Sequence, residues 1–343
     1  MTKSILLLVS VLSLNLSIFA QDKIEFEDFD IPSSIRAIEV LNDSTLFFAG
    51  SNGIFGKLVN DKITLDSIIN NDGSKPEFRA IAFNQKNIFI LSVGNPAMLF
   101  KIEPFQAKMI PKLVYLEEHP NVFYDAMTFA NEKIGYAMGD PTEECFSFIK
   151  TVDGGDTWAK ADCNSLPKII VGEAAFAASN STIKALENFV WMVSGGKASR
   201  VFISNDQGEN WKVVQTPMVQ GKEMTGIYTC DFFDENNGII MGGNWDDKPE
   251  KIGNKAITKD SGNTWTLIAD NELPPYISCV RYVPNTNGKE IVGVSTQGIF
   301  TSSDSGEHWK MISDRSFYTI RFTQKNSAWL AGHKKISKIT FHE

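Results

Sequence analysis

The chain has 343 residues, of which 43% are hydrophobic and 22% are charged, and its formal net charge at pH 7 is −8. This length is enough for one large β domain or for two ordinary domains. The acidic balance, with no basic run in the sequence, argues against nucleic acid or an anionic membrane as the main partner.

The first twenty residues have the pattern of a secretory signal peptide. Lys3 is the only charge before the apolar run over residues 5–19, and Ala20-Gln21 offers a cleavage point. The run is too short for a membrane span and polar residues follow it directly. No other run is long and apolar enough to cross a bilayer. We therefore expect a signal peptide over residues 1–20, a single domain over residues 21–343, and export to the periplasm or the extracellular space.

A four-residue pattern recurs along the rest of the chain. Its third position is small and its fourth is apolar or Cys, as in a strand with two different faces. A small residue on one face suits an inner strand that is pressed against its neighbours near a central axis. The copies begin at Ile35, Phe78, Tyr124, Glu173, Ile227, Tyr276 and Phe317.

Each copy is followed by an apolar strand that ends in a Gly turn, and then by two more strands. This order predicts a ring of seven blades, with six or eight blades as the alternatives. The last unit has only three strands before the chain ends, whereas the strand at residues 24–29 has no unit of its own. We expect that strand to complete the last blade, because closure removes sheet edges that would invite aggregation.

Four of the expected hairpins carry the motif [Ser/Thr]-x-Asp-x-Gly-x-x-Trp, with the Asp residues 53, 54 and 44 positions apart. Repeats at this period indicate a propeller or a solenoid. Gly takes a positive φ without steric cost, Asp bonds nearby backbone N–H groups, and Trp packs over the turn. The motif is therefore interpreted as a structural turn. The copies span residues 151–158, 204–211, 258–265 and 302–309.

This motif resembles the Asp-box, or BNR repeat, of sialidases, sortilin-type receptors and the photosystem II stability/assembly-factor propellers. The chain looks most like the last of these and their secreted relatives, through inner strands such as Phe78-Arg79-Ala80-Ile81. The resemblance covers about residues 30–343. It implies an all-β, seven-bladed propeller of four-stranded antiparallel blades that binds a partner protein without catalysis.

Four cysteines follow the expected signal peptide, so disulfides are permitted. Cys145 and Cys163 flank the first Asp-box hairpin at opposed positions, within disulfide range. We predict that they form a bridge. Cys230 and Cys279 occupy equivalent inner-strand positions, too far apart to bond, and are expected to be buried apolar substitutes.

The resemblance places the Asp-boxes on the face opposite the usual binding side, so we expect the site where the inner strands begin. Arginines there could hold a carboxylate in a bidentate manner, which predicts a protein or peptide partner or an anionic glycan. The alternative is that Arg36 and Arg79 pair with Asp125 and Glu173 and merely fill the channel. The candidate binding residues are Arg36, Arg79, Asp125, Glu173, Tyr228, Lys197, Arg200 and Trp245.

A sialidase-like glycoside hydrolase is the second hypothesis. Such an enzyme needs two carboxyl groups, or a Tyr nucleophile, and Glu173, Asp125, Tyr276 and Tyr318 are the candidates. The Arg-Ile-Pro signature of sialidases is absent near the first blade, where Arg36-Ala37-Ile38 stands. The sequence shows no metal-ligand spacing and no phosphate-binding Gly loop. We therefore expect no metal and no cofactor, and we expect a monomer.

Overall fold

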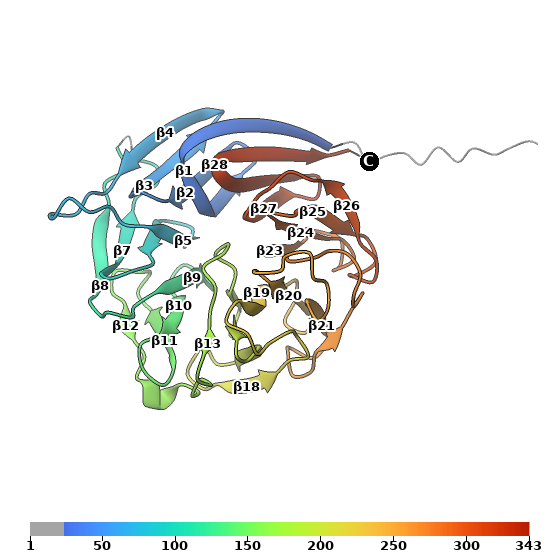
Figure 1. The fold of residues 1–343 in the computed structure, drawn as a ribbon. Helices are drawn as coiled ribbons and strands as arrows, with labels where there is room; N and C mark the ends of the chain where they lie inside the picture. The colour runs from blue at the N-terminus through green and yellow to red at the C-terminus, as the bar shows by residue number, and fades with distance from the viewer. Residues whose placement is uncertain (1–23, 107, 343) are drawn as a thin grey trace, which may run out of the picture.

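The computed structural model describes residues 24–106 and 108–342, so the expected signal peptide lies outside the described residues. Strands make up nearly all regular structure in this part of the chain, and its sheets stand in a ring (Figure 1). The single helical element among these residues is a 3-10 turn, Cys163–Ser165. No helix within these ranges has the length and hydropathy needed to cross a membrane. The predicted all-β propeller is confirmed.

The described strands form six sheets, and four of these sheets have four antiparallel strands each. In each four-stranded sheet, the strand that comes first in the chain contacts at least one strand of each neighbouring sheet, which places these strands innermost in the ring. The four-stranded sheets are β5 (Phe78–Phe83), β6 (Ile88–Ser92), β7 (Ala97–Ile102) and β8 (Lys112–Glu117); β9 (Tyr124–Phe129), β10 (Gly135–Pro141), β11 (Phe146–Thr151) and β12 (Ala159–Lys160); β14 (Ile183–Leu186), β15 (Phe189–Val193), β17 (Arg200–Ser204) and β18 (Lys212–Gln215); and β23 (Cys279–Tyr282), β24 (Ile291–Ser295), β25 (Gly298–Ser302) and β26 (Lys310–Ser313).

The other two sheets have six strands each. One runs in the order β27-β28-β1-β2-β3-β4 and the other in the order β13-β16-β19-β20-β21-β22. Their strands are β27 (Thr319–Gln324), β28 (Ser327–Phe341), β1 (Ile24–Asn42), β2 (Thr45–Gly50), β3 (Ile54–Val59) and β4 (Lys62–Ser67); and β13 (Glu173–Ala174), β16 (Gly195–Gly196), β19 (Thr225–Phe232), β20 (Gly238–Asn244), β21 (Lys255–Thr258) and β22 (Thr266–Leu267).

The prediction of seven four-stranded blades is therefore wrong, because the described residues form six blades. The physical reason is the length of β1, which runs without interruption for 19 residues. Its first part pairs with β28 and its second part pairs with β2. The first and last expected blades are thus one continuous sheet.

The expected pairing of the N-terminal strand with the end of the chain is present. Ile24 pairs with Phe341 and Phe29 pairs with Ile336, so the two ends of the described chain lie side by side (Figure 1). Ile24 packs against the core between the last sheets, and the Phe29 ring lies 5.7 Å from the Trp329 ring. Burial of these side chains fixes the register, since a shift by one residue would expose them.

The small residues of the inner strands are packed as the sequence predicts. Ala37, Ala80 and Ala126 are fully buried in successive inner strands. The predicted disulfide is also present: Cys145 is bonded to Cys163, with their Cα atoms 5.6 Å apart. The two remaining cysteines are unbonded and buried, as expected.

Candidate functional site: the channel mouth

Four inner strands carry a β-bulge near the place where they begin. In β1 the pairing passes from Ile35 to Ala37, so that Arg36 is the extra residue. Equivalent bulges leave Arg79, Asp125 and Tyr228 unpaired in β5, β9 and β19. A bulge re-aims the side chain of its extra residue. The repeated bulge is therefore why these four residues share one end of the ring.

Arg36 lies at the centre of this end, which we call the channel mouth (Arg36, Arg79, Tyr276 and Tyr318). Its guanidinium carbon stacks 4.1 Å from the centroid of the Tyr318 ring, and its Nη1 donates to Ala178 O at 3.3 Å. Arg36 forms no ion pair with any described residue. Burial, followed by the nearby charge of Arg79, lowers its pKa. A guanidinium in this position would gain from an anionic ligand.

Arg79 is the more accessible cation of the pair, with 30% of its side chain exposed. Its Nε lies 3.5 Å from Glu77 Oε1 but makes no hydrogen bond to a described residue. The ring of Phe123 lies 5.9 Å from its guanidinium carbon. No ion pair among the described residues joins Arg36 or Arg79 to Asp125 or Glu173, so the channel-filling alternative is wrong in its pairing.

Tyr228, Tyr276 and Trp245 lie together in an aromatic cluster beside the mouth. The Phe176 ring stacks on Tyr228 at 3.9 Å, and Tyr276 meets Tyr228 edge-on at 4.8 Å. Trp245 lies 5.4 Å from Tyr276, with Lys248 Nζ over its ring. Tyr276 is fully buried, and its hydroxyl has no hydrogen-bond partner among the described residues. Burial therefore raises its pKa well above the usual value, which suits packing rather than nucleophilic attack.

A buried carboxyl group, Asp125, lies near Arg79 and beside the half-buried Asp140. Burial and the neighbouring Asp140 raise the pKa of Asp125 well above its usual value. The N–H groups of Asp140 and Ala177 face Asp125, yet no hydrogen bond of normal geometry reaches either of its carboxylate oxygens. Burial likewise raises the pKa of Asp140 to about 6, although Ala175 N donates to its Oδ1 at 2.9 Å. Asp125 is fully buried, so it is closed to substrate.

Glu173 and Arg200 are paired with each other rather than presented to a ligand. Arg200 Nε donates to Glu173 Oε1 at 2.9 Å, and Arg200 Nη2 forms a second bond to Oε2. Ser194 Oγ and Ile170 N also donate to Glu173. Lys197 is exposed, and its Nζ donates to Gly221 O at 2.9 Å. The proposed hydrolase residues thus form no open pair of carboxyl groups within the described structure.

The sequence pattern misplaced Glu173 because the inner strand of its unit begins later. That strand is β14, and Glu173 belongs to the two-residue strand β13. Between them the chain leaves the sheets and reaches into the middle of the ring (Figure 1). We call residues 175–182 the channel segment.

The channel segment is held by hydrogen bonds from most of the surrounding inner strands. Asn180 Nδ2 donates to Ile81 O at 2.7 Å, and Met127 N donates to Asn180 Oδ1 at 2.8 Å. Ser179 Oγ donates to Ser278 O, and its carbonyl accepts from Thr319 Oγ1. These contacts join residues that are distant in sequence, so no local pattern predicts them. The one sequence feature that could indicate them is the run of small polar residues Ser179-Asn180-Ser181-Thr182.

The four Asp-box turns lie at the opposite end of the ring. In each one the first hydroxyl donates to the Asp and accepts from the Gly N–H, as Ser204 does with Asp206 and Gly208. The N–H and side chain of Asn210 hold the pKa of Asp206 at about 2. The same set of bonds recurs in the other three turns. Gln207 N donates to Asn188 O in the turn after β14, which places the box at the far end of that inner strand.

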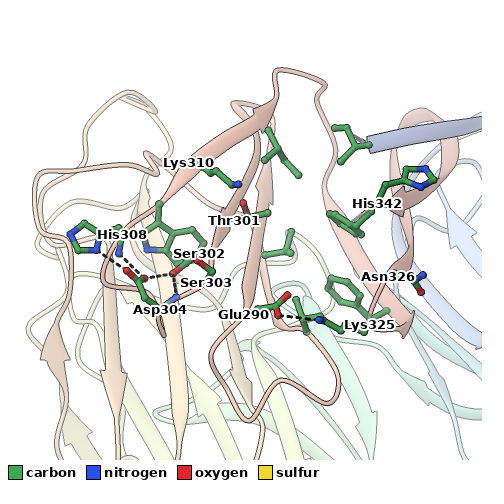
Figure 2. Close-up of a pocket in the computed structure, with 17 residues that line it drawn as sticks. Glu290, Thr301, Ser302, Ser303, Asp304, His308, Lys310, Lys325, Asn326 and His342 are labelled. Atoms are coloured by element: carbon green, nitrogen blue, oxygen red, sulfur yellow. Dashed lines mark hydrogen bonds and ion pairs between the residues drawn. The ribbon is translucent and has the colours of Figure 1, made fainter. Parts of the chain in front are cut away.

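A groove of about 560 Å³ opens between β23–β26 and the closing strands. Figure 2 shows Asp304 and His308 on one side of it and the Glu290–Lys325 ion pair lower down. The mutually close ligand atoms of Asp304, Glu307 and His308 could hold a metal ion, but all three residues are exposed. None of the predicted site residues lines this groove.

The chain matches no protein-family model and no curated protein. Its fold resembles several solved propellers. YCF48 bound to D1 peptide has a TM-score of 0.61 and 12% identity, covering 93% of this chain and 97% of that one. The RRP9 WD40 repeats have a TM-score of 0.65 and 11% identity, covering 94% and 98%. The WD40 β-propeller domain of Doa1 has a TM-score of 0.59 and 10% identity, covering 90% and 93%. At these identities the likeness establishes the propeller fold alone.

Proposed function

We propose that this propeller is a binding scaffold that recognises a protein or peptide segment at the channel mouth. The observation that carries the proposal is the pair of neighbouring guanidiniums, Arg36 and Arg79, with Arg36 in no ion pair among the described residues. Two such groups suit a carboxylate, either a chain terminus or an acidic side chain. The aromatic rings beside them add apolar contact area. YCF48, a propeller of similar fold, has been solved with a bound peptide.

The test uses a synthetic array of peptides, each with a free and an amidated C-terminus. Peptides selected by the wild-type protein are measured by fluorescence anisotropy against the double variant Arg36→Gln/Arg79→Gln. Loss of two charge-assisted hydrogen bonds, each about 1.5–3 kcal/mol, should weaken binding by roughly 100-fold or more. A matched control is Lys86→Gln/Lys133→Gln, which changes the net charge equally at exposed turn positions. Selected peptides that bind the Arg double variant as tightly as the wild type would contradict the proposal.

We also propose that the protein is exported, with cleavage near Ala20. The apolar residues 5–19 support this, as does the Cys145–Cys163 disulfide, since such bonds persist in oxidising compartments. N-terminal sequencing of the protein from its native source should begin at Gln21. A native chain that still carries Met1 or Thr2 at its N-terminus would show that export by this route does not occur.

A further inference from the structure

The channel holds a cavity on the side of the channel segment away from the mouth. Its volume is about 320 Å³, at the lower end of the range for small-molecule pockets. The charged side chains that line it come from five inner strands, and Asn180 of the channel segment lines it too. These charged residues are Glu39 on β1, Lys184 on β14, Asp231 on β19, Arg281 on β23 and Arg321 on β27.

The channel segment separates this pocket from the mouth. Arg36 binds the carbonyl of Ala178 from the mouth side. Arg321 Nη2 binds the carbonyls of Ser179 and Asn180, at 3.2 and 3.0 Å, from the pocket side. Consecutive residues of one segment are thus held from opposite ends, so a ligand in the pocket and a ligand at the mouth would not share contacts.

Neither arginine of the pocket forms an ion pair within 4 Å with a carboxylate in the described part of the chain, although Asp231 and Glu39 act to raise the pKa of Arg281. Arg281 Nη1 donates to Val280 O at 2.7 Å and to Cys230 O at 3.3 Å, and its Nε and Nη2 have no hydrogen-bond partner among the described residues. Arg321 bonds to carbonyls, to Thr319 Oγ1 and to Cys279 Sγ. Lys184, in contrast, is already paired, because its Nζ lies 2.8 Å from Asp231 Oδ1.

Glu39 is the other acid of the pocket, and it forms no ion pair within 4 Å with a described residue. Burial raises its pKa to about 7, although Arg321, Arg281 and Lys184 act in the opposite direction. With Glu39 ionised, three cations and two acids line the pocket, and protonation of Glu39 leaves an excess of two positive charges. An arriving anion would therefore favour the protonated form of Glu39.

We propose that this pocket binds a small oxyanion between Arg281 and Arg321, and that Glu39 takes up a proton when the anion binds. Both guanidiniums are half-buried without a carboxylate within 4 Å, and a bidentate oxyanion would supply both charge and acceptors. A terminal carboxylate and a tetrahedral oxyanion share this chemistry. The site is independent of the proposed channel-mouth function.

Other titratable groups line the pocket or lie against its two arginines, and they enter the same balance. Burial acts to raise the pKa of the Cys279 thiol, but Arg281 and Arg321 lower it to about 7. Burial raises the pKa of Tyr282, which stays neutral near pH 7. Burial also raises the pKa of Cys230, to about 12, so this thiol stays protonated. Among the residues that line the pocket, none from β5 or β9 has a titratable side chain. Of these groups, Cys279 is thus the one whose titration could give binding the same pH dependence as the titration of Glu39.

The experiment titrates the purified chain by calorimetry with two probes at pH 6 and pH 8. Sulfate stands for tetrahedral oxyanions, and N-acetylglycine stands for a peptide C-terminus. We expect one of them to bind with a one-to-one stoichiometry and, since the pKa of Glu39 is about 7, up to about tenfold more weakly at pH 8. Binding of sulfate alone assigns a tetrahedral ligand, and binding of N-acetylglycine alone assigns a carboxylate.

Variants distinguish binding in this pocket from binding at the mouth, and the titration of Glu39 from that of Cys279. Glu39→Gln should raise the affinity at pH 8 to the wild-type value at pH 6, whereas the exposed control Glu118→Gln should leave the pH dependence unchanged. Cys279→Ser should keep that dependence, and Arg281→Gln should weaken binding at least tenfold. The proposal is overturned if neither probe binds the wild type at pH 6, if Glu39→Gln leaves the affinity at pH 8 unaltered, or if Arg36→Gln/Arg79→Gln abolishes binding.

Discussion

The pKa values of aspartate side chains are shifted in opposite directions at the two ends of the propeller. At the Asp-box end, hydrogen bonds from Asn210 and His308 lower the pKa of Asp206 and Asp304 to about 2. At the channel mouth, burial raises the pKa of Asp140 to about 6 and that of Asp125 well above its usual value. The carboxylates of Asp206 and Asp304 are half-exposed and have donors within four residues, whereas Asp125 is fully buried without a hydrogen bond of normal geometry and Asp140 is half-buried with one donor.

This difference distinguishes the turns, which stabilise the fold, from the carboxyl groups at the candidate binding site. The Asp-box turns are satisfied locally and repeat the same bonds four times, so they stabilise the fold. Carboxyl groups whose ionised form is disfavoured are retained at a cost in stability, and such groups gather at functional sites. The contrast therefore supports a binding site at the channel mouth and not at the turns.

The largest expected effect follows from removing the amide that anchors the channel segment. Asn180→Ala leaves Ile81 O and Met127 N without a partner in the core, at roughly 1–3 kcal/mol each. Asn180 also has a positive φ of 55°, which Ala disfavours by about 1 kcal/mol. Guanidinium denaturation should show a loss of about 4 kcal/mol in the free energy of unfolding.

The control for this variant is Asn188→Ala, an exposed Asn whose Oδ1 accepts only from the Gln207 side chain. It should change the free energy of unfolding by less than about 0.5 kcal/mol. An equal response of the two variants would mean that the channel segment does not brace the ring.

A medium effect is expected from Asp140→Asn, which removes a half-buried ionisable group. An acid whose folded pKa is raised stabilises the protein below its unfolded pKa, and this contribution is lost as the pH rises through the folded pKa. Wild-type stability should thus fall between about pH 4 and pH 6 relative to the variant, by up to about 3 kcal/mol. Denaturation midpoints over pH 4–8 measure this. The midpoints of the exposed control Asp314→Asn should follow the same pH dependence as those of the wild type. If the midpoints of Asp140→Asn follow it too, the raised pKa of Asp140 is refuted.

The smallest effect, with the opposite sign, is expected from Asp206→Asn. A lowered folded pKa gives stability that is present above the unfolded pKa and is lost as the pH falls toward about 2. The variant should be less stable than the wild type at pH 5, by under about 1 kcal/mol because the site is exposed, and the gap should close by pH 2.5. Thermal melts at the two pH values test this, and a gap that widens on acidification would reverse the assignment.

Much of the fold could be predicted because its signals are local. The Asp-box spacing identified the hairpins, alternation identified the inner strands, and opposed positions around one hairpin identified the Cys145–Cys163 bridge. The blade count was wrong because nothing in the sequence marks where β1 leaves one partner strand for the next. Apolar and polar residues alternate in the same way in both halves of β1, so the blade count depends on which strands lie beside each half.

The candidate site was predicted only in part, for a related reason. Arg36 and Arg79 were both expected where the inner strands begin, and they lie at equivalent bulges because their strands repeat the same pattern. Glu173 was placed by a similar pattern that the chain does not use as an inner strand. Its partner Arg200 had been identified as a separate candidate, although the two residues neutralise each other.

By itself the sequence determined the propeller class, the Asp-box turns and the disulfide, since each depends on residues close together in the chain. The tertiary structure alone decided that the chain would cross the ring at residues 175–182. It also decided that Asp125 would be buried beside Asp140 and Arg79, and that Arg281 and Arg321 would line one pocket with Glu39. These arrangements join side chains from strands far apart in sequence, and their energies depend on burial, which no local pattern encodes.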